Sequence, residues 1–239
     1  MTTSEAKLEL ITNPDDFAGA FRACAAAFGH QTHDGVWMSF NPGWDTPEGE
    51  KAGAKRLVGR WSSVTKNRDG QPNTIFIKAT VDNVIAGVSI WQQFSVVDGY
   101  GDAPVEDIRK STNLEELHPG NESEQRFLQQ AERSLHKRRW EIIKEKATAS
   151  PPAVMVMDLC VVDPAFQKRG IAKKLVQWGL DEAERRGSLE SITEASSMGR
   201  VVYIKQGFKQ EGGEIVYEMD DEFKARDVPS NVVLRTGGQ

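Results

Sequence analysis

Alternating apolar and β-branched positions in the first hundred residues predict three strands. They lie near residues 8–11, 75–81 and 84–91. Asp82–Asn83 joins the last two runs, and a two-residue connection of this type is typical of a tight hairpin. The pattern therefore predicts an antiparallel pair close to the N-terminal strand.

Two helical patterns separate the first strand from this hairpin. The first, Asp15–Phe28, carries Ala and Phe at three- and four-residue spacing and is expected to end in a left-handed cap at Gly29. The second, about Glu48–Lys66, places apolar residues on one side of a helix, namely Leu57, Val58 and Trp61.

Residues 97–152 break the alternation of strands and short helices. A long amphipathic helix is expected from Asn121 to about Ala147, with Asn121 and Glu124 as a capping box. Its apolar stripe consists of Phe127, Ala131, Leu135 and Ile142. This segment is interpreted as a helical insertion, because no linker sets it apart as a second domain.

The remaining core is expected to follow the insertion. An almost continuously apolar run at 154–162 is typical of a strand buried on both faces. The succeeding elements are a helix at 170–186, a strand at 189–193, a helix at 198–206 and strands near 208–210 and 215–219. The chain is thus predicted to be one domain over 1–239, with a core at about 7–220, the insertion at about 97–152 and a tail at about 221–239.

Charge and composition narrow the possible functions. The chain has 35 acidic against 30 basic residues, a net charge of −5, and no run of about 20 apolar residues. An acidic protein repels phosphate backbones, so nucleic acid and membrane are not expected partners. Its two cysteines, Cys24 and Cys160, are too few for a disulfide framework, and no signal-peptide pattern is seen, so a cytoplasmic location is expected.

A candidate phosphate site stands at the start of the 170–186 helix. The loop Gln167-Lys168-Arg169-Gly170-Ile171-Ala172 combines small residues with two cations where unpaired N–H groups and the helix dipole favour an anion. Walker and dinucleotide-binding patterns are absent from the sequence. The alternative is an ordinary helix start that carries two surface cations.

Two motifs resemble the GNAT superfamily of acyl-CoA-dependent N-acetyltransferases. Val162-Asp163-Pro164 followed by Gln167–Ala172 resembles the family's strand end and Q/R-x-x-G-x-G/A loop. About 30 residues later, Tyr203-Ile204-Lys205-Gln206-Gly207-Phe208 matches the family's second block, in which Ser196 replaces the usual Asn and Gly199 the usual Ala. The resemblance is sharp over 153–218 and only topological over 8–92.

The resemblance implies a fold and a co-substrate. The fold would be α/β (α+β), a mixed and mostly antiparallel sheet flanked by helices, splayed between its fourth and fifth strands, with the insertion before the fourth. Acetyl-CoA would be the co-substrate, and no metal would be needed. The residues implied to bind it are Cys160, Val161 and Val162 at the pantetheine arm, Gln167, Lys168, Arg169, Gly170, Ile171 and Ala172 at the pyrophosphate, and Ser196.

Acetyl transfer to an amine needs an acid for the departing thiolate and a base for the ammonium. Tyr203 lies where many family members place the acid, although a packed aromatic residue is the alternative. Asp158 is the one charged residue in the buried strand and is expected to share a face with Cys160 and Val162, so it is the candidate base. The alternative is a structural Asp paired with an Arg or with backbone donors.

Other polar groups give weaker signals. His30, His33 and Asp34 are candidate substrate residues, whereas the two histidines lack the further ligands of a metal site. Lys137-Arg138-Arg139 is interpreted as a solvated helix face. A nucleophilic role for Cys160 is disfavoured, because no histidine neighbours it in sequence. Aromatic residues are expected in the core or cleft wall, namely Trp37, Phe40, Trp44, Trp91 and Phe94.

The sequence therefore predicts transfer of an acetyl group from acetyl-CoA to a primary amine of a small molecule within a ternary complex. Two alternatives stay open: acetylation of Lys or N-terminal amines of proteins, and a non-catalytic CoA-binding sensor or interaction module. The protein is expected to be a monomer or a homodimer.

Overall fold

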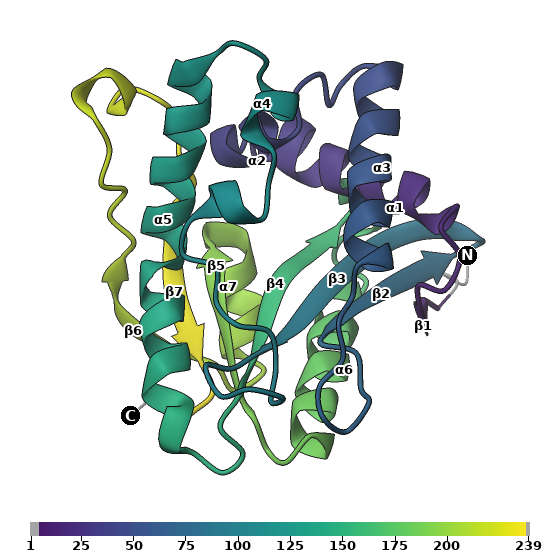
Figure 1. Ribbon diagram of the computed structural model, residues 1–239. Coiled ribbons are helices and arrows are strands. Elements are labelled where there is room, and N and C mark those ends of the chain that lie inside the picture. The colour runs from purple at the N-terminus through teal and green to yellow at the C-terminus, as the bar shows by residue number, and fades with distance from the viewer. Residues whose placement is uncertain (1–4, 238–239) are drawn as a thin grey trace.

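The computed structural model describes residues 5–237, which form a sheet of seven strands with helices on both faces (Figure 1). The strand order is β1-β2-β3-β4-β5-β7-β6, and the neighbours are antiparallel except for the parallel pair β4 and β5. The strands are β1 Lys7–Leu10, β2 Thr74–Val81, β3 Val84–Phe94, β4 Val154–Val162, β5 Glu190–Ser196, β6 Lys209–Glu214 and β7 Asn231–Arg235. The predicted fold class is thus confirmed.

The predicted helices appear in the predicted order as α1, α3, α5, α6 and α7, whereas α2 and α4 were not predicted. The α-helices are α1 Asp16–Cys24, α2 Gly35–Phe40, α3 Pro47–Ser62, α4 Leu114–Leu117, α5 Glu122–Glu145, α6 Ile171–Arg185 and α7 Ser197–Ile204. A π-helical segment, η1 Ala25–Gln31, extends α1, and 3-10 turns occupy Ile108–Lys110, Lys146–Thr148, Pro164–Phe166 and Asp221–Phe223. None of the helices within residues 5–237 combines the length and apolar character that a membrane span requires.

The helices divide between the two faces of the sheet. Ile171 and Leu175 of α6 pack in one apolar cluster with Met155 and Met157 of β4. The other face is covered by α1 and α3 over β2 to β4, and by α5, whose Ile142 packs with residues of β4, β5 and β7. The second face is therefore bordered by α3 on one side and by α5 on the other.

Local signals for turns and caps are largely confirmed. Asp82 and Asn83 both have positive φ, 49° and 63°, as a tight hairpin turn requires. Asn121 caps α5 by accepting from the Glu124 N–H at 3.1 Å. The Glu124 carboxylate binds Arg226 instead of closing the predicted capping box, so only half of that box forms.

Two predictions, one of a strand and one of a helix end, are wrong. Ile215–Met219 forms no strand; instead, Asn231–Arg235, predicted as tail, is fully buried as β7 between β5 and β6. Gly29 is not a left-handed cap, because the helix continues through η1 to Gln31. A Cβ at Gly29 would lie 2.3 Å from the Trp44 ring, so glycine is required there for packing.

Candidate active site

The sheet opens between β4 and β5. These strands pair only from Val154–Val156 to Glu190–Ile192. Thr193 Oγ1 donates to the Met157 carbonyl at 2.9 Å just beyond the last pair. From Asp158 onward the β4 edge faces no neighbouring strand, which is the predicted splay.

Main-chain groups of two residues point into this opening. The Asp163 N–H donates to the Ala86 carbonyl at 2.9 Å, which makes that pair a hydrogen-bonded pair of the β3–β4 ladder. Because bonded and non-bonded pairs alternate in antiparallel strands, Val161 is turned to β3 while Cys160 and Val162 are turned to the open edge. The main chain of Cys160 and the N–H of Val162 can therefore pair with an extended ligand, whereas the Val162 carbonyl accepts from the Gln167 side chain.

The loop before α6 presents its backbone to solvent. Lys168 and Gly170 have φ values of 62° and 76°, and no side chain caps the helix. The Lys174 N–H donates to the Gly170 carbonyl at 3.1 Å in the first turn, which leaves the N–H groups of Ile171–Lys173 without an intrahelical partner. This geometry is suited to a phosphate group.

Side chains of the loop connect it to its surroundings. The Gln167 Nε2 donates to the Val162 carbonyl at 3.1 Å and to the Gln31 Oε1 at 2.8 Å. Arg169 Nη2 donates to the carbonyl of Ala165 at 3.2 Å. Lys168 is exposed and makes no ion pair with residues 5–237, so its ammonium is available to an anion.

Tyr203 lies at the other end of the opening. Its side chain is buried against Phe208, and burial, followed by the neighbouring Cys160 thiol, raises its pKa well above the ordinary value. A Cβ at Gly199 would lie 2.9 Å from the Tyr203 hydroxyl oxygen. Glycine at this position therefore makes room for the phenol, which explains the departure from the family's Ala.

Ser196 has a structural partner. Its Oγ accepts from the Gly199 N–H at 3.3 Å and caps α7. Its predicted contact with the co-substrate stays a prediction.

The candidate base Asp158 occupies a β-bulge. Trp91 pairs with Met157 and Ile90 pairs with Leu159, so Asp158 is the extra residue of β4. A bulge of this kind interrupts the alternation of side chains along a strand.

The bulge turns Asp158 away from its expected neighbours. Cys160 packs on the α6 side of the sheet, as does Val162, whereas the Asp158 carboxylate meets Arg60 of α3 and Arg139 of α5. The prediction that Asp158 shares a face with Cys160 and Val162 is therefore wrong.

Asp158 belongs to an ion-pair network that crosses the splay. Its Oδ2 lies 2.7 Å from Arg60 Nη2 and its Oδ1 lies 2.8 Å from Arg139 Nη1. Arg139 Nε also donates to Glu194 of β5 at 3.0 Å, so one guanidinium joins the two separated strands. Burial alone would raise the pKa of Asp158, but Arg60 and Arg139 outweigh it and hold the pKa far below its ordinary value. These contacts favour the structural interpretation of Asp158.

We expect Asp158→Asn to lower the free energy of unfolding by about 1.5–3 kcal/mol, because it removes charge from two hydrogen bonds to arginine. The folded-state pKa of Asp158 is depressed, so its contribution is present above the unfolded value of about 3.9 and lost as the pH falls towards the folded value. Denaturant unfolding between pH 3 and 7 measures both effects. Asp107→Asn, at an exposed pair, is the control. Equal stability of Asp158→Asn and wild type would contradict the structural role.

The charge pattern of the sequence did not reveal that the Arg139 side chain is buried. The predicted solvated face holds for exposed Lys137, but the Arg139 side chain is only 3% exposed, so that part of the prediction is wrong. The signal was its three-residue spacing from Ile142, a member of the apolar stripe.

An aromatic wall borders the second face near the N-terminal helices. The Trp37 and Trp44 ring centroids lie 5.9 Å apart, and the His30 ring lies 4.8 Å from Trp44. Asp34 caps α2 by accepting from the Trp37 N–H at 2.9 Å, and burial raises its pKa. Asp34 has no cationic partner among the described residues. His33 is exposed, and residues 5–237 hold no group of three metal-ligating side chains.

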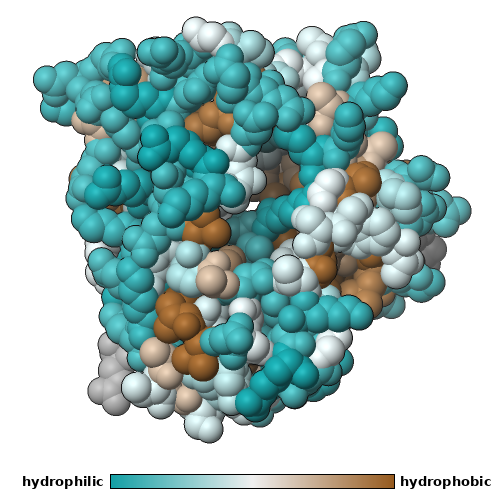
Figure 2. All heavy atoms as spheres, viewed as in Figure 1, coloured by the Kyte–Doolittle hydropathy of each residue, from teal (hydrophilic) through white to brown (hydrophobic). Residues whose placement is uncertain are grey.

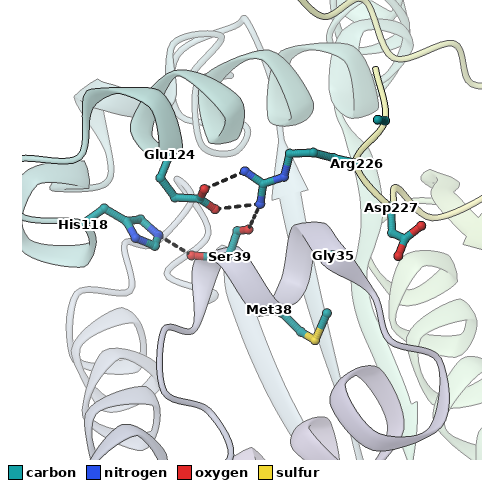
Figure 3. Close-up of a pocket in the computed structure, with 8 residues that line it drawn as sticks. Gly35, Met38, Ser39, His118, Glu124, Arg226 and Asp227 are labelled. Carbon is teal, nitrogen blue, oxygen red and sulfur yellow. Dashed lines mark hydrogen bonds and ion pairs between the residues drawn. The ribbon is translucent and has the colours of Figure 1, made fainter. Parts of the chain in front are cut away.

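A cavity of about 480 Å³ adjoins this wall. It lies between α2, the start of α5 and residues 225–227, and Figure 3 shows Glu124 and Arg226 pointing toward each other beside it. Arg226 holds Glu124 at 2.6 and 2.9 Å, and His118 Nε2 lies 2.7 Å from the Ser39 carbonyl. The residues predicted to bind CoA do not line this cavity, which has the size of a small-molecule site.

Comparisons with known proteins agree with this geometry. The model of the acetyltransferase (GNAT) domain matches residues 150–219. A search of curated protein sequences finds no match.

Solved structures share the fold at low sequence identity. Arylalkylamine N-acetyltransferase 2 from Aedes aegypti is 18% identical, with 96% of this chain and 97% of that chain covered and a TM-score of 0.61. An agmatine N-acetyltransferase is 10% identical, with coverage of 97% and 98% and a TM-score of 0.55. A Corynebacterium glutamicum protein, described as histone acetyltransferase HPA2 and related acetyltransferase, is 15% identical, with coverage of 97% and 96% and a TM-score of 0.52. The predicted resemblance to the GNAT superfamily is confirmed.

Proposed function

We propose that this protein transfers an acetyl group from acetyl-CoA to a primary amine of a small molecule by direct attack in a ternary complex. The observation that carries this proposal is the continuous path along the open β4 edge. It leads from the unpaired N–H groups of Ile171–Lys173, past the N–H of Val162 and the main chain of Cys160, to the buried phenol of Tyr203. Pyrophosphate, pantetheine and thioester follow one another in the same order along CoA.

The reaction balances with groups on this path. The neutral amine attacks the thioester carbonyl carbon, which forms the C–N bond, and the C–S bond breaks. The thiolate takes the Tyr203 proton, and the surplus proton of the new amide nitrogen returns to the Tyr203 oxygen. In this proposal the Cys160 N–H, which is turned to the open edge at the residue whose side chain neighbours Tyr203, donates to the oxyanion.

A small acceptor is favoured by how the second face is covered. Figure 2 shows the molecule hollowed between α5 and α3, with both polar and hydrophobic residues around the hollow. The inserted helix α5 closes one side of this hollow, and α2, which carries Trp37, lies above it (Figure 1). An extended peptide would need an open groove, so protein acetylation is the alternative within the same chemistry.

Thiol release from acetyl-CoA tests the proposal. We expect turnover with small primary amines, including an arylalkylamine and a polyamine, and no turnover with a lysine-containing peptide. Mass spectrometry should identify the N-acetylated product. Calorimetric CoA binding without turnover on any amine would favour the non-catalytic CoA-binding module, and turnover on the peptide alone would favour protein acetylation.

A further inference from the structure

Glu132 and His136 form a carboxylate–imidazole pair on the inserted helix α5. The His136 Nδ1 lies 2.8 Å from Glu132 Oε2, and the two side chains are only 12% and 23% exposed. The four-residue spacing places both on one face of the helix. With Nδ1 beside the carboxylate, Nε2 is the ring nitrogen left to exchange a proton with another group.

The Nε2 atom is free to act. It has no hydrogen-bond partner among residues 5–237. It is also not one of the fully buried atoms without a partner, which means that it is reached by solvent. Nε2 therefore touches open space although most of the ring is buried.

The pair faces the splayed strands. Arg139, one turn further along α5, lies on the same side and binds Asp158 of β4. The His136 ring packs edge-on against Trp140 at 5.6 Å, and Trp140 packs against Phe94 of β3 at 5.8 Å. The packing on Trp140 and the electrostatic effect of His136 on Asp158 place His136 near the bulge of β4.

The negatively charged groups around His136 favour binding of an ammonium. They do not compete with His136 for the ammonium proton. Glu132 pairs with it from α5 itself, and Asp158 of β4 lies close enough for the two charges to interact. Arg139 of α5 binds both Asp158 and Glu194 of β5. Arginine already neutralises Asp158 and Glu194. The Tyr217 hydroxyl is buried without a partner; burial, followed by the nearby carboxylates Asp34, Glu132 and Glu194, raises its pKa.

We propose that His136 is the general base of the acetyl transfer and that Glu132 is its positioning residue. His136 Nε2 takes one proton from the acceptor ammonium, directly or through one water, and later releases it to solvent. The neutral amine then attacks the thioester as described above. This inference rests on the proposed function, since it assigns a proton acceptor to that reaction.

The test compares wild type with His136→Gln, which keeps a polar side chain beside Glu132. We expect kcat at pH 7 to fall about 100-fold with an alkyl amine, while calorimetric CoA affinity and Tm stay unchanged. The acid limb of the wild-type kcat/KM profile should be absent from the variant. Glu132→Gln should give a smaller loss. Glu141→Gln, on the exposed side of the same helix, is the matched control.

An alkoxyamine, already neutral at pH 7, separates a base from a merely structural residue. His136→Gln should acetylate it at nearly the wild-type rate, and imidazole in the buffer should partly restore activity on the alkyl amine. Wild-type activity of His136→Gln on the alkyl amine, or an equal loss on both acceptors, would overturn the role of His136 and leave the proposed function standing. Absence of turnover by wild type would overturn both.

Discussion

Replacing Gly170 with aspartate should weaken CoA binding about 1,000-fold. Gly170 has a φ of 76° and open space around its Cα, so the new carboxylate would stand at the N-terminus of α6 among the N–H groups of Ile171–Lys173. Two unit charges about 4 Å apart interact by about 4 kcal/mol at an effective dielectric constant of 20. Each 1.36 kcal/mol is a factor of about ten. Isothermal calorimetry with CoA measures the loss.

Gly170→Asn is the matched control, because asparagine has the shape of aspartate, tolerates a left-handed backbone and can cap a helix without charge. It should bind CoA within about tenfold of wild type. Equal weakening of CoA binding by both variants would show that the effect comes from the shape of the side chain or from helix capping, and not from its charge. Unchanged affinity of Gly170→Asp would overturn the assignment of the phosphate loop.

Local sequence signals predicted the parts of the site that depend on backbone conformation. The apolar run of β4, the glycine before α6 and the Tyr203 block each have short-range causes: burial, positive φ and helix periodicity. These features place the predicted co-substrate path along one strand edge. The sequence was sufficient there because neighbouring residues decide the geometry.

The face of the sheet to which the Asp158 side chain points depends on the partner strand β3, so β4 alone could not predict it. A bulge is defined by unequal residue counts on two paired strands, and β3 is separated from β4 by the whole insertion. Strict alternation was therefore the only pattern visible in β4 itself. The same bulge brings Asp158 between Arg60 and Arg139, which explains why a charge is tolerated in this strand.

The last strand of the sheet was decided by competition between two apolar segments. Tyr217 and Met219 alternate as strand residues do, yet they pack with Phe127 of α5. Asn231–Arg235 takes the sheet position beside β5, where all five residues are buried. Alternation alone could not rank these segments, because the surface of the inserted helix was available to one of them.

Tyr203→Phe should lower kcat by about 100- to 1,000-fold and leave the affinity for CoA unchanged. Phenylalanine keeps the ring beside Phe208 and under Gly199, and it removes only the proton that the departing thiolate needs. The raised pKa of Tyr203 keeps the phenol protonated through the neutral range, so the loss should be similar from pH 6 to 9. This flat profile distinguishes the acid from the proposed base, whose effect depends on pH.

Thiol release under saturating acetyl-CoA measures this loss, and calorimetry confirms that the co-substrate still binds. Tyr100→Phe, at a ring that packs on Arg68 away from the β4 edge, should keep wild-type activity. If Tyr203→Phe also kept full activity, the residue would be a packed aromatic, as the alternative interpretation of the sequence holds. The thiolate would then leave unassisted, which a thiol with an ordinary pKa of about 8.5 permits only if other groups stabilise its charge. The N–H groups of the open β4 edge would be the candidates for that role.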